Sequence, residues 1–76
     1  MSNDLISRRI YCQTWETAKG DRIDIAFTWY EMKKMPYAYR YEKRKNLFEQ
    51  HGFDYKNACV IKEWYFDENG EIKYDE

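Results

Sequence analysis

The side chains best suited to catalysis are few and far apart in this sequence. His51 is the only histidine, and Cys12 and Cys59 are the only cysteines. A nucleophile–base pair needs a thiol within hydrogen-bond reach of an imidazole, and no motif places His51 beside either cysteine. The position of His51 before Gly52 is typical of the last turn of a helix, where the helix dipole favours a cation. We therefore expect no enzymatic activity.

The sequence also predicts no metal site and no cofactor. It contains no Cys-x-x-Cys or His-x-x-x-His spacing, so zinc would have to gather both cysteines, the histidine and a carboxylate from distant positions. A glycine-rich phosphate loop is also missing. Asp67 and Glu68 are adjacent carboxylates, but they fall at a predicted turn, which encloses no cleft. With no signal-peptide pattern and no apolar run of membrane-spanning length, we expect a cytoplasmic protein with reduced thiols and no membrane partner.

The most suggestive stretch is the basic segment, residues 33–45, in which tyrosines alternate with cations. Aromatic rings beside Lys and Arg stack bases and contact phosphates in proteins that bind single-stranded nucleic acid. The same pattern suits an amphipathic helix, with Tyr37, Tyr41 and Phe48 on its buried stripe and the cations in water. Small ribonucleases use Lys, Arg and Tyr, so the one enzymatic alternative also rests here. The nucleic-acid contacts would be Lys33, Lys34, Tyr39, Arg40, Lys43, Arg44 and Lys45.

The acidic hairpin, residues 63–76, has the opposite character. It carries six carboxylates against a single lysine, Lys73, and its aromatic residues are interleaved with the acids. Such a ribbon is suited to a basic groove on another protein. A charged edge also protects a sheet from aggregation, which is the simpler interpretation. The candidate protein-binding residues are Trp64, Tyr65, Asp67, Glu68, Glu71 and Tyr74.

Aromatic residues dominate the apolar content of the chain. Eight Tyr, four Phe and three Trp occur among 76 residues, with 43% hydrophobic and 36% charged residues overall. A domain of this size buries only some of these rings, and exposed Tyr and Trp are frequent in contact surfaces. The net charge of −1 argues against general duplex-DNA binding, which usually needs a basic excess.

The elements that must position these residues form one α+β domain over residues 1–76, with residues 1–6 expected to be a disordered N-terminus. Residues 8–17 and 22–30 predict two strands, joined by a turn at residues 18–21. In the second strand, apolar and polar residues alternate strictly. The residues of its apolar face are Ile23, Ile25, Phe27 and Trp29.

The second half of the chain predicts a helix followed by another hairpin. Residues 36–51 suit a helix, with Pro36 in its first turn and Gly52 at its C-terminal cap. Residues 57–66 are apolar on both faces, which is typical of a central strand. The Val60 side chain is predicted to share a face with Trp64. Asn69-Gly70 predicts a type I′ turn before a short edge strand at residues 71–74. The predicted fold is an antiparallel sheet of about four strands, in the order ββαββ, with one helix packed on a face.

These observations favour a small non-catalytic protein that binds a larger intracellular protein and regulates or inhibits it. Small regulators and inhibitors, including those encoded by phages and mobile elements, can work in this way, and the small size of the chain suggests such an origin. The alternative is a module that binds single-stranded nucleic acid through the basic segment. A homodimer, in which a second copy completes an undersized core, is the third hypothesis.

Overall fold

The computed structural model describes residues 7–74, so the predicted disorder of residues 1–6 lies outside the described part of the chain. Its elements are β1 (Ile10–Glu16), β2 (Arg22–Thr28), α2 (Trp29–Lys33), α3 (Tyr37–Gln50), β3 (Cys59–Phe66) and β4 (Ile72–Tyr74). The strands form one four-stranded antiparallel sheet in the order β2-β1-β3-β4. The predicted α+β class is confirmed, with two strands before the helical segment and two after it. The short helix α2 was not predicted.

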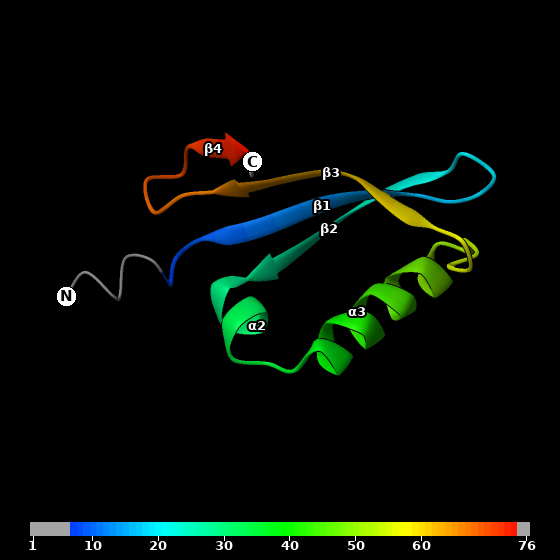
Figure 1. Ribbon diagram of the computed structural model, residues 1–76, viewed down its shortest axis with the longest axis horizontal. Coiled ribbons are helices and arrows are strands. Elements are labelled where there is room, and N and C mark those ends of the chain that lie inside the picture. The colour runs from blue at the N-terminus through cyan, green and yellow to red at the C-terminus, as the bar shows by residue number, and fades with distance from the viewer. Residues whose placement is uncertain (1–6, 75–76) are drawn as a thin grey trace.

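The core lies between α3 and one face of the sheet. Figure 1 shows α2 and α3 together on the same side of the strands. The alternation of β2 buries Ile23, Ile25 and Phe27 against the helices, as predicted, while the residues between them are exposed. Phe48 of α3 is fully buried and completes this cluster. Apolar burial of this kind is the main driving force of folding.

The strand predicted over residues 22–30 ends two residues early, because Thr28 begins helix α2. Thr28 Oγ1 accepts a hydrogen bond from the Glu31 backbone N–H, and the Glu31 carboxylate accepts one from the Thr28 N–H. This reciprocal capping box satisfies two donors that would otherwise lack a partner at the helix start. Trp29 therefore lies in the first turn of α2 and does not continue the apolar face of β2.

The bounds of α3 match the predicted helix to within one residue at each end, but only the C-terminal part of its predicted apolar stripe is buried. Tyr37 and Tyr41 are exposed, whereas Arg44 and Phe48 are buried. The Arg44 guanidinium carbon lies 4.5 Å from the ring centroid of Trp15. The long stem of an arginine covers apolar surface, and its planar head packs on an aromatic face. Arg44, a cation that was predicted to face water, therefore takes a core position.

Arg40 fixes the rotation of α3 relative to α2. Its Nη1 donates hydrogen bonds to the carbonyl oxygens of Glu31, Met32 and Met35, at the end of α2 and in the linker. The carbonyls of Glu31 and Met32 are among those that a helix leaves without intrahelical partners at its C-terminus. With Arg40 turned toward α2, Arg44 follows one turn later and faces the sheet.

The two hairpins close with the same kind of turn, and at Asn69-Gly70 it differs from the predicted type I′. In the β1–β2 turn, the Gly20 N–H donates to the Thr17 carbonyl, and in the β3–β4 turn the Gly70 N–H donates to that of Asp67. Both glycines have positive φ, 92° and 80°, but Asn69 does not. A type I′ turn needs positive φ at both central residues. The β3–β4 turn is therefore a type I turn followed by a glycine in the left-handed conformation.

A β-bulge in β3 changes the predicted distribution of its side chains. Thr14 pairs with Lys62, while the next residue of β1, Trp15, pairs with Val60, so Ile61 is the extra residue. The bulge moves Val60 to the helix-covered face, whereas Trp64 stays on the opposite one. The prediction that these two residues share a face is therefore wrong. The prediction of an inner strand is confirmed, since β3 lies between β1 and β4.

Candidate functional site

The sheet face opposite the helices carries a contiguous apolar surface built from three strands. The register places Cys12, Trp64 and Tyr74 in one row across β1, β3 and β4. A second row lies beside it, because Ile10 pairs with Phe66, which pairs with Ile72. Directly opposed residues of antiparallel strands point to the same face. We call this surface the open face, and it comprises Ile10, Cys12, Trp64, Phe66, Ile72 and Tyr74.

No helix or loop of residues 7–74 covers the open face, since α2 and α3 pack on the other side (Figure 1). Ile72 is 51% exposed and Tyr74 is 61% exposed, whereas the smaller Cys12 is buried beneath its neighbours. The Lys62 ammonium lies 5.3 Å from the ring centroid of Trp64 and 5.7 Å from that of Tyr74. One lysine therefore contacts both rings at the surface of the open face.

The acidic hairpin residues are distributed over both faces and the turn. Tyr65 lies on the helix side, where the Arg9 guanidinium packs 5.1 Å from its ring centroid. Glu68 pairs with the same arginine at 3.1 Å, so its charge is compensated. Asp67 Oδ1 accepts hydrogen bonds from the backbone N–H groups of Glu71 and Asn69, which lower its pKa. Glu71 is exposed and immediately precedes Ile72, at the end of the turn that leads into β4.

Most cations of the basic segment contact other parts of the same molecule. Arg40 binds backbone carbonyls, and the buried Arg44 donates to the Tyr55 hydroxyl. Lys33 packs over the ring of Tyr11 and Lys34 over that of Trp29. The ion pairs of the described residues do not connect this segment with the acidic hairpin. The two charged blocks therefore do not neutralise each other in the part of the chain that the structure describes.

Glu31 is the centre of a compact polar cluster between α2 and α3. Its carboxylate accepts hydrogen bonds from Tyr39 Oη at 2.6 Å and from Lys43 Nζ at 2.9 Å. Partial burial alone would raise the pKa of Glu31, but these bonds and the Thr28 N–H outweigh it and lower the pKa to about 2. Tyr39 and Lys43, two predicted nucleic-acid contacts, thus hold the helices together here.

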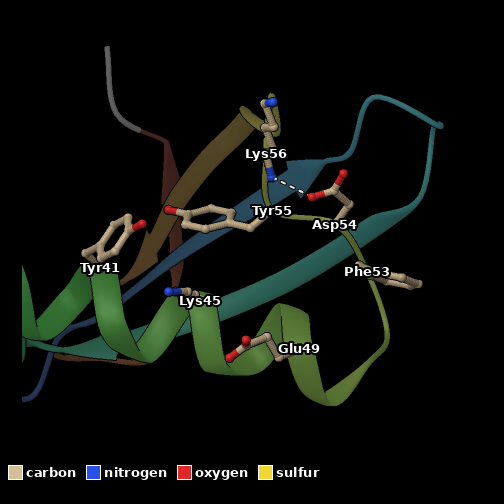
Figure 2. A pocket seen from close by; sticks show the side chains of 7 residues that line it. All are labelled: Tyr41, Lys45, Glu49, Phe53, Asp54, Tyr55 and Lys56. Atoms are coloured by element: carbon tan, nitrogen blue, oxygen red, sulfur yellow. Dashed lines mark hydrogen bonds between the residues drawn. The ribbon is translucent and has the colours of Figure 1, made fainter.

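A groove lies between α3 and the segment that leads into β3, apart from the open face (Figure 2). This groove has a volume of about 520 Å³. Lys45, the remaining cation of the basic segment, contributes to its wall. The residues that line it are Tyr41, Lys45, Glu49, Phe53, Asp54, Tyr55 and Lys56.

The described residues show little that suits metal or redox chemistry. No group of three or more His, Cys, Asp and Glu side chains among them is placed to hold a metal ion. Cys12 and Cys59 are both free thiols, the first buried and the second exposed. No helix within the described range is long and apolar enough to cross a membrane.

Comparison with known proteins gives no relative: no family model, no curated protein and no solved structure matches this chain.

Sequence reasoning found part of the open face and missed the groove. Trp64 and Tyr74 were candidates, but Ile10, Phe66 and Ile72 were not. The alternation that put Phe66 on the same face as Trp64 was a usable signal, whereas the neighbouring Ile10 depended on a strand pairing that no local pattern specifies. The groove lies between α3 and residues 53–56, so predicting it requires knowing how these two segments pack against each other.

Proposed function

We propose that this protein is a non-catalytic binding module that regulates or inhibits a larger intracellular protein by docking through the open face. The observation that supports this proposal is the uncovered double row of apolar side chains. Exposed apolar patches rimmed by polar residues mark interaction sites. Rings that are rigid, partly exposed and central in a patch are the usual binding hot spots. Trp64 of the inner strand β3 fits this description, and Tyr74 lies next to it on the edge strand β4, with Lys62 packed on both rings.

The partner is a protein with an apolar ridge and basic side chains at one end of it. The ridge would cover Trp64, Tyr74 and Ile72. The basic side chains would face Glu71 and Asp67, which lie at the two ends of the turn that joins β3 and β4. Attraction between such charges accelerates association and fixes the orientation of the partner.

Binding of single-stranded nucleic acid through the basic segment receives less support. Arg44 is buried, and Lys43 is paired with Glu31. A strand-binding surface needs cations that are free to follow a phosphate backbone. Nucleic-acid binding is therefore the alternative that the nuclease treatment in the experiment below would detect.

The test is capture of partners from lysate by the tagged chain, with and without nuclease, compared between variants. We expect Tyr74→Ser to weaken capture of the main protein partner by about tenfold or more, because an exposed aromatic contact of the open face is lost. The matched control is Tyr30→Ser. Tyr30 is 60% exposed, much like Tyr74, but lies in α2 on the other side of the sheet. Captured protein that is equally retained by both variants would contradict docking through the open face.

Charge reversal tests the basic end of the partner. Glu71→Lys should weaken capture and increase its salt dependence, whereas Glu42→Lys, the same charge change on the exposed side of α3, should leave capture unchanged. Loss of every captured partner on nuclease treatment would overturn the proposal in favour of a nucleic-acid ligand.

A further inference from the structure

The buried guanidinium of Arg44 lacks an anionic partner in the described part of the molecule. Arg44 is 5% exposed, its Nε has no hydrogen-bond partner, and it forms none of the ion pairs described above. The rings of Trp15 and Phe27, with centroids 4.5 and 5.9 Å from its Cζ, offset part of the cost of burial. A buried charge is costly without a counter-charge, and a protein retains one most readily where function requires it.

Arg44 is connected to the groove through the hydroxyl group of Tyr55. Arg44 Nη1 donates a hydrogen bond to Tyr55 Oη at 2.9 Å, so this oxygen already acts as an acceptor. The phenolic proton must then be donated in another direction. Tyr55 lines the groove, which makes its hydroxyl a donor available to a ligand there.

The donors of the groove converge at one end of it. Figure 2 shows the hydroxyl ends of Tyr41 and Tyr55 directed toward each other, with the amino end of Lys45 on the helix side of them. The two rings are in contact, with centroids 5.6 Å apart. Glu49 lies one helical turn further along α3. Asp54 lies at the opposite end, where its Oδ1 accepts a hydrogen bond from the Lys56 backbone N–H.

We propose that this end of the groove binds an aromatic anion, in which a phosphate group is carried on a ring. The phosphate oxygens accept hydrogen bonds from Tyr55 Oη and Lys45 Nζ, and their charge balances the buried Arg44 nearby. The ring of the ligand packs against Tyr41 in the offset or tilted manner of aromatic pairs. A nucleotide and a phosphotyrosine side chain both place a phosphate near a ring, so either is a source of this chemistry.

The test is titration with phenyl phosphate at constant ionic strength, followed by tryptophan fluorescence, since Trp15 contacts both Arg44 and Tyr55. We expect saturable binding with a dissociation constant of about 1 mM or below for so small a ligand. Tyr55→Phe keeps the ring and removes the donor, and it should weaken binding by about tenfold. Lys45→Met changes an exposed side chain, so it tests the same site without risk to the core.

The control variants are Tyr30→Phe and Lys73→Met, which change exposed residues far from the groove and should bind as the wild type does. Absence of saturation at about 10 mM phenyl phosphate would overturn the proposal, as would equal binding by Lys45→Met and Lys73→Met. If inorganic phosphate binds as tightly as phenyl phosphate, the ring of the ligand does not contribute and that part of the proposal is wrong. Tighter binding of adenosine monophosphate or of a phosphotyrosine peptide than of phenyl phosphate would support the site and identify its source. The open-face variant Tyr74→Ser should retain phenyl phosphate binding, so the two proposals can fail independently.

Discussion

At the scale of single residues, Glu31 joins both helices and links the fold to pH. The pKa of its carboxyl is lowered from an ordinary 4.5 to about 2, so its contribution to stability is complete above the higher value and is lost as the pH falls toward the lower one. The full shift corresponds to roughly 3 kcal/mol, and solvent screening around the partly exposed Lys43 reduces its contribution to about 2 kcal/mol. We expect urea unfolding to show this loss between about pH 5 and about pH 2.

Glu31→Gln should remove most of that acid-dependent component. The amide still accepts a hydrogen bond from the Thr28 N–H, so the capping box persists, but the charge opposite Lys43 is lost. We expect a decrease of about 1 to 2 kcal/mol in the free energy of unfolding near neutral pH. Glu42→Gln, an exposed change on α3, is the control. An unchanged acid-dependent component in Glu31→Gln would show that other carboxyls are responsible.

Arg44 should contribute less to stability than its burial suggests. Arg44→Met removes the guanidinium, with its unpartnered Nε, and keeps a long apolar side chain over Trp15. Because desolvation of a charge opposes its other contacts, we expect the free energy of unfolding to stay within about 1 kcal/mol of the wild type or to rise. Urea denaturation measures this change. A decrease of about 3 kcal/mol or more would show that Arg44 serves the fold itself and would weaken its link to an anion.

At the scale of elements, periodicity predicts the strands and the long helix. It fails where contacts with a neighbouring element determine the orientation or the register of a segment. The alternation of β2 identifies its buried face correctly because one face packs on helices and the other does not. The orientation of α3 depends on Arg40, whose acceptors belong to α2, a helix defined by local capping at Thr28. The bulge at Ile61 depends likewise on pairing with β1. Long-range contacts of this kind leave no trace in a single segment.

The two hairpin turns allow a direct comparison of the strands that they join. An added Cβ meets nothing within 4 Å at Gly20 or Gly70, so alanine at either position costs only backbone strain at positive φ. That cost is about 1 to 2 kcal/mol. We expect Gly20→Ala to lower the global free energy of unfolding by this amount, because β2 carries the core.

Gly70→Ala should have a smaller global effect, below about 0.5 kcal/mol, because the strain is relieved if the short exposed β4 opens. The backbone N–H groups of Ile72–Tyr74 should then exchange with deuterium faster than in the wild type. Equal global destabilisation by the two substitutions would show that β4 unfolds only with the whole domain.

At the scale of the whole molecule, the core and the candidate docking surface occupy opposite sides of one sheet. The buried apolar residues are Cys12, Ile23, Ile25, Phe27 and Phe48, and most of them lie beneath the helices. The open face lies on the other side of β1, β3 and β4, where no helix of residues 7–74 covers it, and it includes the buried Cys12. The number of aromatic rings in the sequence predicts that several are exposed. Which rings are exposed, such as those of Tyr37 and Tyr41, follows only from the packed structure.

This division predicts that stability and partner binding respond to different substitutions. Phe48 is fully buried and its ring centroid lies 4.8 Å from that of Tyr55, so Phe48→Ala should cost about 3 to 5 kcal/mol. A small domain has only a few kcal/mol of stability, and this variant should be largely unfolded by circular dichroism. Tyr74→Ser should stay within about 0.5 kcal/mol of the wild type, because the ring is mostly exposed. If Tyr74→Ser unfolds the chain as Phe48→Ala does, the open face is part of the core and loss of partner capture by that variant reports folding, not docking.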